Sequence, residues 1–203
     1  MADGFARQGF HLGDTAAVGL GLADMLVFLA AERVEHACQH LSLSWDPAQD
    51  TLVEPWYDPL RPDGTGGVRE TPAYAVTRLF AGHLLERYAT ITDEGAGPVD
   101  TYRFGDAAVP AGRVSPVAFA SADGRAGTVF FLHREIDLAE RVTFDVEEGV
   151  SVIAATQWAP AAWNEDTTGK EIPVTDAEIR QVGREIQVLA PPHSVVALRV
   201  ERR

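Results

Sequence analysis

The chain has 203 residues, of which 46% are hydrophobic, so it can build one large domain or two small ones around a real core. It carries 30 acidic against 17 basic residues, a formal net charge of -13, and the basic residues are scattered. This charge argues against nucleic acid and anionic membrane surfaces as partners, because both would repel it.

The N-terminal residues and the cysteine content indicate the compartment. Met1 to Phe5 contain no basic segment followed by an apolar one, and no stretch approaches the roughly 18 apolar residues of a membrane span. Cys38 is the single cysteine and cannot form an internal disulfide. His36 and His40 lie four residues apart on the predicted helix, but the residues between them include no catalytic glutamate, so no zinc site is predicted. We therefore expect a cytoplasmic protein without a metal or other cofactor.

A long first helix is predicted from Asp14 to about His40, with Asp14 or Thr15 as its N-cap. Its apolar residues recur at intervals of three and four and form one face, which comprises Val18, Leu22, Met25, Leu26 and Leu29. Gly19 and Gly21 weaken the first turns by roughly 1 kcal/mol each. The helix is therefore expected to need a surface to dock on.

Between Leu41 and Arg69 the sequence predicts a long loop, because prolines and glycines are too frequent for a long regular element. Loops of this length are often functional, so contacts with a ligand are expected here. Trp56 is a candidate for binding a sugar, since aromatic rings form platforms for sugars; the alternative is that it anchors the loop.

A second helix is predicted to begin at Pro72, with Thr71 as its N-cap, and to reach Leu85 or Arg87. Its expected apolar face comprises Val76, Leu79, Phe80 and Leu84. After Tyr88 the sequence changes to short strand-like segments separated by turn residues. We therefore place a domain boundary between residues 95 and 96, which divides the chain into residues 1–95 and 96–203.

The second part is predicted to be an antiparallel β-sandwich. Six strands are expected, at Val117–Ser121, Thr128–His133, Arg141–Val146, Val150–Gln157, Glu185–Leu189 and Ser194–Glu201. Alternation in the last of these predicts one buried and one solvated face. The sandwich is expected to fold independently of the helices.

Three segments resemble family 51 α-L-arabinofuranosidases. Leu189–Val200, with its Pro-Pro pair followed by an alternating apolar strand, resembles the strand that closes the family's C-terminal sandwich. Glu70–Phe80 looks like the last helix of the family's (β/α)8 barrel. Gly21–Ala30, followed by Val34 and Ala37–Gln39, is similar to the helix after the nucleophile strand. The resemblance implies an α+β chain in which two helices and a long loop from the end of a (β/α)8 barrel precede the antiparallel β-sandwich.

The family's chemistry is retaining glycoside hydrolysis, which needs a carboxylic acid and a nucleophilic carboxylate. Both residues lie upstream of the segment that this chain resembles, so no position here inherits a catalytic role. The family often has a glutamine lining the sugar pocket just before the last helix, and this chain has Glu70 there. Glu70 is therefore a candidate substrate-binding residue for an arabinofuranoside, at the position of that glutamine.

Two functions from different classes remain open. The first is a C-terminal portion of an arabinofuranosidase-like hydrolase, acting in the breakdown of arabinose-containing polysaccharide and inactive alone. It predicts that the face of Val18, Leu22, Met25, Leu26 and Leu29 binds a missing barrel half or another copy of the chain. The alternative is a non-catalytic carbohydrate-binding or structural β-sandwich module, which needs a self-sufficient core.

Overall fold

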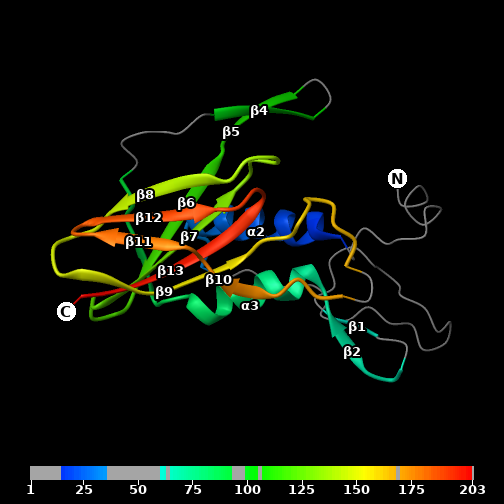
Figure 1. The fold of residues 1–203 in the computed structure, drawn as a ribbon, viewed down its shortest axis with the longest axis horizontal. Helices are drawn as coiled ribbons and strands as arrows, with labels where there is room; N and C mark the ends of the chain where they lie inside the picture. Colours follow the sequence, from blue (N-terminus) through cyan, green and yellow to red (C-terminus); the bar gives the residue numbers. More distant parts are fainter. Residues whose placement is uncertain are drawn as a thin grey trace.

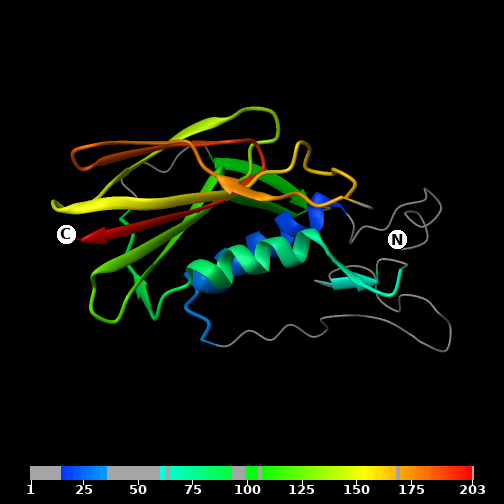
Figure 2. The same cartoon turned by 60° about the horizontal axis from the view of Figure 1, so that its bottom comes forward.

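The computed structural model describes residues 15–35, 60–62, 65–92, 99–104, 107–167 and 170–202. In this part of the chain, two helices lie side by side against one face of a β-sandwich (Figures 1 and 2). The α+β class predicted from the sequence is thus confirmed. The predictions for His36, Cys38, His40 and Trp56 lie outside the described residues.

Helix α2 spans Ala16–Ala31 and is therefore shorter than the predicted helix from Asp14 to about His40. Arg33 adopts a left-handed φ of 56° and donates from its backbone N–H to the Ala30 carbonyl, at 3.0 Å. The next N–H, from Val34, reaches the Leu29 carbonyl at 2.9 Å. This pair of hydrogen bonds is a Schellman motif, which closes the helix. The end of the helix could not be predicted from the sequence, because the left-handed position is occupied by arginine and not by the glycine that usually marks it.

Helix α3 spans Pro72–His83 and begins where the sequence predicts. The Thr71 side chain accepts a hydrogen bond from the Tyr74 N–H at 3.4 Å, and proline occupies the first turn, where no N–H is needed. The helix buries Val76, Leu79 and Phe80, as expected. The prediction for Leu84 is wrong, because this residue adopts an extended backbone at the C-cap and is 54% exposed.

The larger sheet is antiparallel and, within the described residues, has the strand order β10-β9-β13-β7-β6-β3. Its strands are β3 (Arg87–Ala89), β6 (Val114–Ala120), β7 (Ala126–His133), β9 (Val150–Trp158), β10 (Val174–Asp176) and β13 (Ser194–Arg202). β13 therefore lies between β7 and β9, although it follows both in the sequence.

A three-stranded sheet of order β11-β12-β8 packs over the second face of the larger one (Figure 2). It consists of β8 (Glu140–Asp145), β11 (Ile179–Val182) and β12 (Glu185–Ala190). Two separate hairpins complete the described elements: β1 (Leu60–Pro62) with β2 (Val68–Glu70), and β4 (Val99–Phe104) with β5 (Ala107–Gly112). The six predicted strands correspond to β6, β7, β8, β9, β12 and β13.

Two hydrophobic clusters hold the described elements together. One lies between the helices and the larger sheet, and the other lies between the two sheets. The predicted solvated face of β13 is wrong for most of the strand, because Val195 and Ala197 contact the helical layer while Val196 and Leu198 contact the second sheet. All four are at most 1% exposed. The sequence could not reveal this, because strands buried on both faces lose their alternation.

The predicted domain boundary at residues 95 and 96 lies outside the described residues. Elements on its two sides nevertheless share a sheet, because β3 pairs with β6 through Tyr88 and Phe119. The rings of these two residues also contact each other, with centroids 5.2 Å apart. Both helices contribute to the same hydrophobic cluster as the strands.

Candidate functional site

Glu70, the candidate for sugar contact, is the last residue of β2 and directly precedes the cap of α3. Its carboxylate forms an ion pair with Arg78 of α3, with 3.0 Å between Glu70 Oε2 and Arg78 Nη1. The Arg78 guanidinium in turn lies 5.7 Å from the centre of the Tyr74 ring. The Glu70 carboxylate is therefore engaged within its own chain.

A small hollow adjoins Glu70 at the beginning of α3, with Thr71, Ile172 and Trp158 among its lining residues. The space that water can occupy in it amounts to about 10 Å³, which is room for roughly one water molecule. A pentose ring does not fit. Among the described residues, Glu70 is thus the one candidate substrate-binding residue that can be placed, and the hollow beside it is too small for a sugar.

Trp158 is a packing residue that the sequence reasoning did not single out. It lies at the end of β9, is completely buried, and supports the beginnings of both helices. Its Nε1 has no hydrogen-bond partner among the described residues. Because an indole N–H is only a donor, a water in the adjoining hollow could accept from it. Its burial could have been predicted from the residue type, since a large aromatic residue at the end of a strand usually packs in a core.

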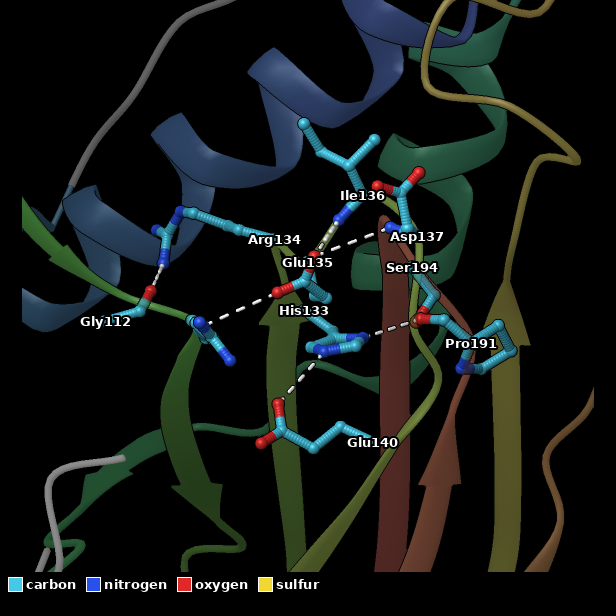
Figure 3. A network of polar contacts seen from close by, with 10 residues as sticks. Gly112, His133, Arg134, Glu135, Ile136, Asp137, Glu140, Pro191 and Ser194 are labelled. Atoms are coloured by element: carbon cyan, nitrogen blue, oxygen red, sulfur yellow. Dashed lines mark hydrogen bonds and ion pairs between the residues drawn. The ribbon is translucent and has the colours of Figure 1, made fainter. Parts of the chain in front are cut away.

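A network of polar contacts lies where β7 ends and β13 begins (Figure 3). His133 is completely buried, with Nδ1 2.7 Å from the Pro191 carbonyl and Nε2 3.1 Å from the Glu140 carboxylate. The Ser194 hydroxyl donates to the same Pro191 carbonyl at 2.7 Å. The network fixes the turn before β13.

Although this network contains a serine, a histidine and a glutamate, its geometry does not fit nucleophilic catalysis. A nucleophile must donate to its base, but the Ser194 hydroxyl donates to a carbonyl and His133 uses both ring nitrogens elsewhere. Ser194 is also completely buried, which denies it a substrate. We therefore assign the network a structural role.

Neighbouring residues make further polar contacts, several of which Figure 3 shows, and one of these residues also pairs with helix α2. Arg134 donates to the Gly112 carbonyl at 2.7 Å and to the Ser115 hydroxyl at 2.5 Å, and it pairs with Asp24 of α2. Glu135 pairs with Arg113 at 3.5 Å and accepts from the Ile136 N–H at 3.0 Å. The helix is thereby joined to the sheet by polar contacts as well as by its buried face.

In the part of the chain that the structure describes, no group of three or more His, Cys, Asp or Glu side chains is placed to hold a metal ion. The described helices include none that is long and apolar enough to cross a membrane.

Neither a protein-family model nor a curated protein matches the sequence. Solved structures do match the fold. A family 51 α-L-arabinofuranosidase from Bifidobacterium longum superposes with a TM-score of 0.71 at 14% identity, over 93% of this chain and 36% of its own. The chain has the fold of part of a family 51 arabinofuranosidase. An α-L-arabinofuranosidase from Thermotoga maritima matches with a TM-score of 0.70 at 17% identity, over 90% of this chain and 38% of its own.

The same architecture also occurs in a second glycosidase family. The catalytic domain of a family 30 xylanase from Talaromyces cellulolyticus matches with a TM-score of 0.57 and 13% identity, over 90% of this chain and 34% of that one. The chain therefore spans less than two-fifths of the length of these structures. Because one fold serves different activities, the similarity does not by itself identify a sugar.

Proposed function

We propose that this chain is the C-terminal portion of an arabinofuranosidase-like retaining glycoside hydrolase, and that it is inactive until a barrel half supplies the catalytic residues. It would act in the breakdown of arabinose-containing polysaccharide. The observation that carries the proposal is the mismatch of lengths: at least 90% of the chain superposes on arabinofuranosidases that are more than twice as long.

The surface of α2 supports the proposal. The helix places Ala16, Gly19, Ala23 and Val27 against the larger sheet and α3. Its opposite side is also apolar: Met25 is 48% exposed and Phe28 is 60% exposed. A helix that is hydrophobic all round normally lies inside a larger structure. The second apolar side thus fits a helix that packs against further protein.

The predicted binding face requires one change. Leu22 and Leu26 pack partly against the described core, whereas Phe28, which was not included, is the more exposed residue. The surface that we propose for a barrel half is therefore centred on Met25 and Phe28. Val34, Leu84 and Tyr88 are also exposed, at 39%, 54% and 39%. Val34 follows α2, Leu84 is the C-cap of α3, and Tyr88 belongs to β3.

A hydrolysis assay tests the proposal. We expect the purified chain to release no 4-nitrophenol from 4-nitrophenyl α-L-arabinofuranoside above background, because two positioned carboxylates are needed and the resemblance assigns neither to this chain. Turnover that follows the protein through purification would contradict the proposal. Glu70→Gln is the matched variant, since its loss of such turnover would identify Glu70 as the responsible group.

A further inference from the structure

The outer strand β10 covers only one end of β9. It pairs with residues 156–158, and Ala177, which follows it, donates from its backbone N–H to the Ala155 carbonyl at 2.9 Å. The chain then passes to the second sheet, where β11 pairs with β12. On its other side β9 pairs with β13 from Val150 to Trp158. Among the described strands, none therefore pairs with the outer side of residues 150–154.

The composition of β9 makes an open edge here hazardous. Its nine residues, Val150–Trp158, include no charged residue, no proline and no glycine. Ile153 is the extra residue where the register with β13 shifts, and it is 50% exposed. Uncharged, proline-free segments with β-branched residues readily pair with strands of other chains when their edge is open.

The side chain of Gln181, a half-buried residue of β11, binds this part of β9. Its Oε1 accepts from the Val152 N–H at 2.9 Å, and its Nε2 donates to the Val150 carbonyl, also at 2.9 Å. The same Nε2 donates to the Gly183 carbonyl at 3.1 Å. These contacts fix the orientation of the amide, because a reversed amide would place its oxygen against two carbonyl oxygens. Gln181 thus occupies an N–H and a C=O that a neighbouring strand would otherwise bind.

We propose that the Gln181 carboxamide guards the edge of β9 and prevents a strand of a second copy of this chain from pairing there. The guard is needed where the chain changes sheets, because the backbone of β11 pairs with β12 and no longer with β9. A second copy is the partner because it carries the same uncharged strand, and edge-to-edge pairing uses backbone groups that every copy presents. This role does not depend on a barrel half.

Hydrogen exchange of the full chain tests the contact itself. In the wild type we expect the Val152 amide to exchange slowly, because Gln181 binds it. Gln181→Leu should accelerate this exchange by about fivefold or more, since the hydrogen bond is lost. The matched control is Gln187→Leu, because the Gln187 carboxamide bonds the side chains of Arg141 and Glu185. Fast exchange of Val152 in the wild type, or no change in Gln181→Leu, would overturn the proposal.

Sedimentation across concentrations tests the guard. We expect Gln181→Leu to associate about tenfold more tightly than the wild type, because the freed edge can add several backbone hydrogen bonds, and Gln187→Leu to behave as the wild type. Gln181→Lys also removes the carboxamide but places a charge at the edge, which disfavours pairing, so it should not increase association. Circular dichroism checks that each variant is folded.

The outcomes separate a freed edge from other causes of association. Equal association of the Leu and Lys variants at Gln181 would attribute it to lost stability and overturn the proposal. A folded Gln181→Leu that associates no more than the wild type would overturn it as well. The added association should persist when Phe28→Lys is combined with Gln181→Leu, because it does not involve the exposed side of α2. Its loss in the double variant would place the contact at α2 and overturn the guard.

Discussion

At the residue scale, the contact between α2 and its surroundings depends on Gly19. A Cβ at this position would lie 2.7 Å from Cη2 of Trp158, and 3.0 Å from both Cβ and the carbonyl oxygen of Pro72. Real Cβ atoms essentially never come so close to Trp158 without a rearrangement. The sequence predicted Gly19 only as a weak helix former, because a sequence does not show what lies against a given position. Its actual role is close packing.

Substitutions at the two glycines of α2 should therefore have opposite effects. Gly19→Ala is expected to lower the free energy of unfolding by about 1–3 kcal/mol, because overpacking outweighs the better helix propensity. Gly21 is exposed and has nothing within 4 Å of its would-be Cβ, so Gly21→Ala should raise it by about 0.5–1 kcal/mol. Urea unfolding measures both. Equal stabilisation by the two substitutions would show that α2 does not pack as described.

At the scale of the elements, the sequence predicted α3 well and α2 incompletely. α3 carries its own local signals, namely Thr71 as a cap and Pro72 in the first turn. α2 is apolar on all sides, so periodicity alone could not tell which side faces the sheet. The face buried in the described structure comprises Ala16, Gly19, Ala23 and Val27, whereas the face predicted from the sequence was assigned to a partner. Three small residues and Val27 are fully buried against the sheet and α3, and Leu22 and Leu26 pack partly beside them.

The outward side of α2 gives a prediction about association. If it binds a barrel half or a second copy of this chain, Phe28→Lys should weaken that association by about tenfold or more, because burial of a Phe side chain is worth roughly 1.5–3 kcal/mol. The stability of the chain itself should change little, since Phe28 is 60% exposed. Analytical ultracentrifugation across concentrations measures the association.

Val182→Lys is the control for this experiment. Val182 is equally exposed, at 60%, but belongs to β11 in the second sheet. We expect it to leave association unchanged. A monodisperse monomer at tens of micromolar, with no effect of Phe28→Lys on mass or solubility, would remove the support for a partner at α2.

At the scale of the whole molecule, fold class was predictable and the layering was not. Turn-forming residues separate the strands in the sequence, as Asp123 and Gly124 do in Ala122–Arg125. The sequence therefore predicted the β-sandwich. Which face the helices cover depends on contacts between segments far apart, which local patterns do not encode. Of the candidate substrate-binding residues, Glu70 proved to be paired within the chain.

The shared core makes the expected independence of the sandwich testable. Without the helices, Phe130 and Trp158 would lose the layer that covers them, although both are completely buried in the full chain. We therefore expect a fragment of residues 99–203 to be much less stable than the full chain, or to bind a dye for exposed apolar surface. Circular dichroism melting of both proteins measures this. A fragment as stable as the full chain would show that the sandwich folds alone, as the sequence first indicated.

The position of β13 has a consequence for how the protein is made. This strand joins β7 on one side to β9 on the other, yet a ribosome synthesises it after both. Until it emerges, the nascent chain contains two incomplete sheets, each with an open edge at the place that β13 will fill. Open edges invite pairing with other chains, and contacts so distant in sequence form slowly. Before β13 emerges, the growing polypeptide is therefore exposed to pairing with other chains at these edges.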